Sequence, residues 1–139
     1  MDESDSTMAR QLARAAGAFE HQRTGHAPRA VTVVLSEDTL VITLHGALSP
    51  AEMALAGSPA GAAQMQEFHR QLFASSSGSL RREIQRITGV EVRQATAEVE
   101  TGSGAVRQMF ASGTVVQVFL LAGSVPADTW SGSGPDGQS

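Results

Sequence analysis

The chain has no cysteine, no lysine and no tyrosine, and it has only one tryptophan and five phenylalanines. Without cysteine, the fold can use neither disulfide bonds nor thiolate metal ligands. Because lysine is absent, a Ser-x-x-Lys nucleophile pair is impossible, and the sequence contains no Gly-x-Ser-x-Gly elbow. With so few aromatic residues, the core must be built mainly from aliphatic side chains and alanine.

Basic residues are also scarce: the chain has ten arginines and fourteen acidic residues, and its formal net charge is -4. Binding to nucleic-acid phosphates requires a dense basic surface. The only local basic cluster is formed by Arg81, Arg82 and Arg86, and this pattern is typical of a solvated helix face. We therefore expect no nucleic-acid partner.

No apolar run approaches the length of a membrane span, and the N-terminal Met1-Asp2-Glu3-Ser4-Asp5 is acidic where a secretory signal would be basic. We expect a cytoplasmic protein that inserts no segment into a membrane and reaches one only through a partner. A chain of 139 residues can bury a core without metals or disulfides. The expected organisation is a disordered leader at 1–7, one domain at 8–121 and a disordered tail at 122–139, rich in serine, glycine and proline.

Apolar periodicity divides the first half of the chain into a helix and a hairpin. Apolar residues from Met8 to Phe19 recur at helical spacing, which predicts a helix that ends near Gly25. Residues 31–35 and 40–45 alternate between more and less apolar positions on either side of a polar turn at 36–39, which predicts a β-hairpin. Because one face of each strand is more apolar, we expect helices to cover one side of the sheet.

The passage from strand to helix at 44–52 carries the clearest local signals. Ser49 is an N-cap residue directly before Pro50, which is favoured at the first helical position. Glu52 stands three residues after Ser49, the spacing of a capping box in which the carboxylate accepts a hydrogen bond from the cap's backbone amide. The functional alternative is that Glu52 acts as a general base or ligand beside His45.

The second half predicts a short helix at 50–56, a longer helix from Ser58-Pro59 to Thr88-Gly89, and two strands. The serine run at 75–79 contains poor helix formers, so this helix can kink or break there. In the strand at 90–100, the apolar residues stand at even positions (Val90, Val92) at its start and at odd positions (Ala95, Ala97, Val99) further on. A β-bulge would produce such a change of face. Residues 114–121 form an almost continuous apolar run, expected at the centre of the sheet or at a subunit contact, and 105–113 continue the hairpin or form a loop.

The predicted fold is therefore α+β, an antiparallel four-stranded sheet covered on one face by helices, in the order α-β-β-α-α-β-β.

The sequence offers little support for a metal or phosphate site. No two of the four histidines are spaced i, i+4, and Gly102-Ser103-Gly104 lacks the Gly-Lys-Ser that a phosphate loop needs. We expect no catalytic residue, no cofactor and no metal. A carboxylate at Glu98 is expected at an exposed edge. The alternative is a pocket at the strand ends that gathers His26, His45, Glu52 and Glu98.

Three blocks of sequence together resemble the MpsC family: Gly25-x-x-Pro28, Leu44-x-Gly46-x-Leu48-Ser49-Pro50-Ala51-Glu52, and Ile84-x-x-Ile87-Thr88-Gly89-Val90-x-Val92. The similarity covers residues 8 to about 121. The chain departs from the family at His26-Ala27, where Arg-Gly is usual, and at Glu98, where aspartate is usual. The resemblance supplies no catalytic residues, and it singles out motif positions of unknown role: Gly25, Pro28, Gly46, Ser49, Glu52, Thr88, Gly89 and Glu98.

The resemblance implies an accessory component of a membrane system for ion or inorganic-carbon transport. The first functional hypothesis is accordingly a non-enzymatic cytoplasmic accessory or regulatory protein that acts through protein contacts. Its expected partners are a membrane transport subunit of the same system and a second copy of itself in a homo-oligomer. The alternatives are a small-molecule-binding domain or small enzyme with the strand-end pocket, and a structural module whose long helix mediates assembly.

Overall fold

The structure, a computed structural model, describes residues 7–100 and 113–125 and confirms the predicted fold class. The elements are α1 (Met8–Thr24), β1 (Ala30–Ser36), β2 (Thr39–His45), α2 (Pro50–Leu55), α3 (Pro59–Ser76), α4 (Gly78–Thr88), β3 (Val92–Glu100) and β4 (Thr114–Leu121). Residues 1–6 of the predicted leader at 1–7, residues 101–112 of the predicted turn and loop, and residues 126–139 of the predicted tail at 122–139 lie outside the described residues.

The strands form one antiparallel sheet in the order β1-β2-β4-β3. β4 therefore lies between β2 and β3, which confirms the central position predicted from its apolar sequence. Leu40 of β2 is paired with Phe119 of β4, and Ile42 is paired with Gln117. This register places the buried side chains of both strands on the same face of the sheet.

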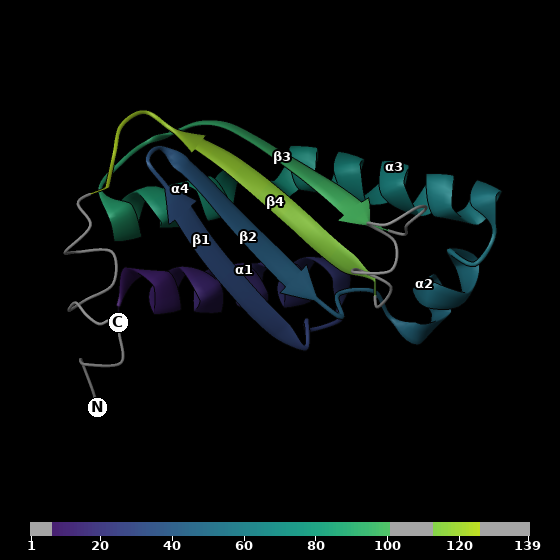
Figure 1. The fold of residues 1–139 in the computed structure, drawn as a ribbon. Helices are drawn as coiled ribbons and strands as arrows, with labels where there is room; N and C mark the ends of the chain where they lie inside the picture. The colour runs from purple at the N-terminus through teal and green to yellow at the C-terminus, as the bar shows by residue number, and fades with distance from the viewer. Residues whose placement is uncertain (1–6, 101–112, 126–139) are drawn as a thin grey trace.

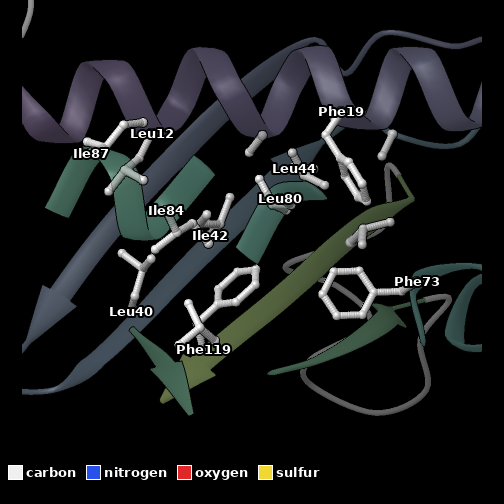
Figure 2. Packing of buried hydrophobic residues seen from close by; sticks show 14 of the residues in the cluster. Leu12, Phe19, Leu40, Ile42, Leu44, Phe73, Leu80, Ile84, Ile87 and Phe119 are labelled. Atoms are coloured by element: carbon white, nitrogen blue, oxygen red, sulfur yellow. The ribbon is translucent and has the colours of Figure 1, made fainter. Parts of the chain in front are cut away.

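α1, α3 and α4 lie on one side of the sheet, behind the strands in Figure 1, and α2 lies at one end of it. The core fills the space between the two layers (Figure 2). Phe73 of α3 links the layers, because its ring lies 6.5 Å from that of Phe19 on α1 and 6.0 Å from that of Phe119 on β4. Val125, beyond the last strand, is also part of this core.

The predicted long helix is in fact two helices, α3 and α4, which meet at Ser77. Ser77 keeps an α-region backbone (φ -75°, ψ -7°), and its carbonyl accepts a hydrogen bond from the backbone of Arg81 at 2.9 Å. No side chain caps the start of α4. The serine run therefore produces the break that its weak helix propensity allows.

The predicted irregularity of the third strand is also present. The β3–β4 register shifts between Val92, paired with Leu121, and Gln94, paired with Leu120. The extra residue in β3 lets the apolar side chains beyond the shift face the core again, because Ala95 is paired with the buried Phe119.

Candidate functional site

Three of the motif positions, Gly25, Thr88 and Gly89, lie at the C-terminal ends of α1 and α4, and these two helices end in the same hydrogen-bonding pattern. Gly25 and Gly89 both adopt left-handed backbone conformations, with φ of 81° and 77°, directly after α1 and α4. Before each glycine stands a threonine whose hydroxyl donates to the carbonyl four residues earlier: Thr24 to Glu20 and Thr88 to Ile84, both at 2.8 Å. The same hydroxyl accepts from the amide two residues later, at 3.2 Å and 3.1 Å. Gly25, Thr88 and Gly89 thus satisfy helix-end carbonyls.

Gly46 serves the turn between β2 and α2. Its φ is 62°, and a Cβ atom there would lie 2.9 Å from Arg29 Nη1. His26 Nε2 donates to the Gly46 carbonyl at 3.2 Å, which ties the α1–β1 connection to this turn. Pro28 lies in the same connection and is half-buried.

Ser49 and Glu52 form the predicted capping box at the start of α2. The Ser49 hydroxyl accepts from the Glu52 amide at 3.3 Å, and Glu52 Oε1 accepts from the Ser49 amide at 2.9 Å. The second carboxylate oxygen has a different partner, because His69 Nε2 lies 3.2 Å from Glu52 Oε2. Glu52 therefore caps one helix and binds an imidazole of another, and the imidazole is that of His69 rather than of His45.

His69 was not singled out from the sequence, although a signal was present. It stands four residues after Met65 and four before Phe73, so it shares their inward face of α3, and it is only 2% exposed. The ring of Phe68 packs edge-on against it at 5.4 Å. A histidine at a core position of an amphipathic helix needs a polar partner, and Glu52 supplies one.

A second buried pair lies on α1. Glu20 has no solvent-exposed surface, and Arg23, one turn later, donates to Glu20 Oε1 and lies with its guanidinium 4.8 Å from the centre of the Phe19 ring. Burial raises the pKa of the Glu20 carboxyl, an effect that the nearby charges of Arg23 and His69 oppose and that of Glu52 reinforces. Titratable groups from α1, α2 and α3 thus interact across the helix layer. We call Glu20, Arg23, Glu52 and His69 the buried charged cluster.

Several polar atoms of this part of the core have no hydrogen-bond partner among the described residues. They are Glu20 Oε2, Arg23 Nε and Nη1, His69 Nδ1, and both side-chain amide atoms of Gln117 on β4. The described residues contain no set of three or more histidine, aspartate, glutamate or cysteine side chains placed to hold a metal ion. The cluster therefore consists of one arginine–glutamate ion pair and one histidine–glutamate hydrogen bond in a largely apolar interior, with unused hydrogen-bonding capacity.

The residues of the alternative strand-end pocket have separate partners. His26 binds the Gly46 carbonyl, His45 Nε2 hydrogen-bonds with Thr32 Oγ1 at 2.9 Å, and Glu52 binds His69. Glu98 is paired with Val116 in the β3–β4 ladder, and its side chain lies outside the described residues. Among the described side chains, the structure therefore brings an imidazole and carboxylates together at the buried charged cluster, where only Glu52 belongs to the predicted set.

The sheet face opposite the helices is a separate surface, which we call the open face. Its middle row runs Val34, Val41, Val118 and Thr96 across the four strands. Val34 is 53% exposed. The neighbouring rows add mainly threonine and serine, together with Val116, Leu120, Gln94 and His45. On β3 the register also places Glu98 opposite Val116 and Glu100 opposite Thr114, so two acidic positions belong to the outer, β3 edge of this face.

These features define a small α+β protein with one helix-covered and one open sheet face, in which helix caps account for most of the distinctive motif positions. The chain belongs to the MpsC family, whose description is "Na+-translocating membrane potential-generating system (MpsC)" and whose family model matches residues 4–112. This confirms the resemblance seen in the sequence. Comparisons with curated proteins and with solved structures gave no match. In the described part of the chain, no helix has the length and apolar character required to cross a membrane.

Proposed function

We propose that this protein is a non-enzymatic cytoplasmic accessory or regulatory component of a membrane ion or inorganic-carbon transport system, and that it acts through protein contacts made by the open face. The family description, which names a Na+-translocating membrane potential-generating system, supports the association with such a system. The partner is then a membrane transport subunit of the same system.

The observation that carries this proposal is the composition of the open face. Val34, Val41 and Val118 form an apolar centre. The neighbouring rows add threonine and serine, together with Val116, Leu120 and Gln94, and the acidic position Glu98 lies in the edge strand β3. Protein–protein interfaces have the same anatomy, with an apolar centre depleted of charge and a polar rim. A solvated face of an antiparallel sheet normally alternates to polar residues instead.

The proposal is tested by recovering the transport subunit from detergent-solubilised native membranes with the tagged chain. Val41→Lys and Val118→Lys place charges in the centre of the open face, and we expect each to lower recovery at least tenfold. Leu55→Lys is the matched control, because Leu55 is an exposed apolar residue on α2, 47% accessible, and does not belong to the sheet. Circular dichroism checks that each variant folds.

The proposal fails if the wild-type chain recovers no transport subunit, or if both open-face variants recover as much as the wild type. If Leu55→Lys recovers as little transport subunit as the two open-face variants, the contact lies on the helical side instead.

A further inference from the structure

The two edges of the sheet differ in how they are protected against pairing with another strand. β3, at one edge, carries a bulge near Arg93, and its sequence includes the charged residues Arg93, Glu98 and Glu100. Bulges and charges are the usual devices that keep an edge strand from adding a partner. β1, at the other edge, has neither device: Ala30–Ser36 reads Ala-Val-Thr-Val-Val-Leu-Ser and pairs with β2 over every residue without a shift.

Beside the β1 edge lies a groove formed with the first half of α1. Thr7, Ala9, Arg10 and Ala13 line it from the helix side, and Val31 and Val33 line it from the strand side. In Figure 1 the N-terminal half of α1 extends beyond β1, so that the helix layer continues past the edge of the sheet. A strand added to β1 would therefore have an apolar surface beneath its inward side chains, as in other cases of β-strand addition.

We propose that the β1 edge binds the β1 edge of a second copy of this chain, antiparallel and centred on Val33, so that the two sheets join into one. This pairing places Val31 of one copy opposite Leu35 of the other, and Thr32 opposite Val34. The inward apolar residues then meet inward apolar residues, because the paired positions share the same parity.

The second copy is the occupant that these observations favour. No charged side chain occurs within β1, so the two strands can pair without placing like charges opposite each other, and the one charged residue that lines the groove, Arg10, lies on α1. The pairing is two-fold symmetric and closes at two subunits, the commonest arrangement of homo-oligomers. Ala9 and Ala13, one turn apart on α1, are small enough for the two α1 helices to approach each other below the joined strands. The contact is made by the backbone edge of β1, whereas the proposed function uses the side chains of the open face, so the inference does not depend on the proposed function even though Thr32 and Val34 belong to both surfaces.

The contact is small, since it consists of one pair of short strands and the two grooves. It falls in the class of interfaces that bury less than about 1,200 Å² in total, which exchange readily. We therefore expect a reversible dimer whose population depends on protein concentration.

The absence of cysteine in the chain permits a direct test by cross-linking. In the proposed register Thr32 lies opposite the partner's Val34. A mixture of Thr32→Cys and Val34→Cys chains, one of them tagged, should therefore form at least ten times more disulfide-linked dimer under mild oxidation than either variant alone. Both sites are exposed, which makes the substitutions compatible with folding. The matched control is a mixture of Thr43→Cys and Val34→Cys, because Thr43 lies on the same face but on β2, away from the edge.

Light scattering of the unmodified chain over a concentration series provides the second measurement. We expect the mass to rise from monomer to dimer, and Val34→Lys to weaken the dimer at least tenfold while Leu55→Lys leaves it unchanged. A monomer at every concentration would overturn the proposal, as would equal cross-linking in the single-variant samples or a dimer abolished by Val118→Lys, which would indicate stacked open faces. If the chain is monomeric and Val34→Lys also loses the transport subunit, the loss is attributed to the open face, to which Val34 belongs. That result refutes the dimer and leaves the proposed function intact.

Discussion

The carboxylate of Glu52 joins two helices: its Oε1 accepts from the Ser49 amide at 2.9 Å, and its Oε2 lies 3.2 Å from Nε2 of His69. α2 has only six residues, none of which is buried, so few apolar contacts hold it against α3. The His69–Glu52 bond is therefore a main attachment of α2 to the helix layer. It also gives a partner to an imidazole that is almost fully enclosed.

The first prediction concerns this double role of Glu52. Glu52→Ala removes a capping interaction worth about 1 kcal/mol and leaves a buried imidazole nitrogen unpaired, which costs about 1–3 kcal/mol more. We expect a total loss of roughly 2–4 kcal/mol in the free energy of unfolding, measured by urea denaturation. Glu52→Gln, which can still cap, should lose less.

The control for this prediction is Glu67→Ala. Glu67 pairs with Arg70 on the solvent side of α3, where both side chains are about half-exposed. Such a surface pair contributes about 0–1 kcal/mol, so its removal should change stability little. Equal losses in Glu52→Ala and Glu67→Ala would contradict a special role for Glu52.

The second prediction concerns pH. Burial raises the pKa of Glu20 above its ordinary value of 4.5, so the folded state holds this proton more tightly than the unfolded state. The resulting stabilisation is complete below the unfolded pKa and is lost as pH rises through the raised folded pKa. Glu20→Gln cannot titrate and lacks this dependence. The stability of the wild type minus that of Glu20→Gln should therefore fall as the pH rises above the ordinary value of 4.5.

Denaturation of both proteins at a series of pH values gives the difference directly, and all other titrating groups largely cancel in it. A difference that rises with pH would show that Arg23 and His69 outweigh burial and lower the pKa of Glu20.

The third prediction concerns the left-handed caps. A Cβ atom at Gly25 or Gly89 would meet nothing within 4 Å, so alanine there is disfavoured only by the backbone conformation. Gly25→Ala and Gly89→Ala should each lower stability by about 1–2 kcal/mol. Gly46→Ala should cost more, because its Cβ would also lie 3.1 Å from Arg29 Cβ, an atom that the flexibility of the arginine side chain cannot move away.

Gly123→Ala is the matched control, since a Cβ atom there meets nothing and the backbone is not left-handed. Its stability should equal that of the wild type. A loss at Gly123 as large as that at Gly89 would mean that left-handed conformation does not explain the effect of the cap variants.

The fourth prediction concerns Gln117, which lies fully buried opposite Ile42 with neither amide atom hydrogen-bonded to a described residue. Gln117→Met keeps the length of the side chain and removes two buried polar atoms. Because an unpaired buried polar group costs about 1–3 kcal/mol, we expect this variant to be more stable than the wild type by an amount in that range. A clear loss of stability, measured by thermal unfolding, would instead show that the amide has partners in the native protein.

The local structure of this protein could be predicted because its signals lie within a few residues of one another. The capping box of Ser49 and Glu52 spans one helical turn, and the hairpin of β1 and β2 follows from alternation on either side of a short turn. The bulge in β3 was visible as a change of parity. The break at Ser77 was only one of two readings, because serine lowers helix propensity without excluding a helix.

The arrangement of charged groups in the core was decided by tertiary structure. In the sequence, Glu20 and Arg23 have the i, i+3 spacing of an ordinary surface pair on an amphipathic helix, and the spacing of His69 to Met65 and Phe73 indicates an inward position without indicating a partner. Only the packing of α1 and α3 against the sheet shows that these side chains are buried, and only the approach of α2 to α3 selects His69 rather than His45 as the partner of Glu52. Local signals act through neighbours along the chain, whereas burial and ion pairing depend on which faces of distant elements meet, and that choice is made by the packing of the whole core.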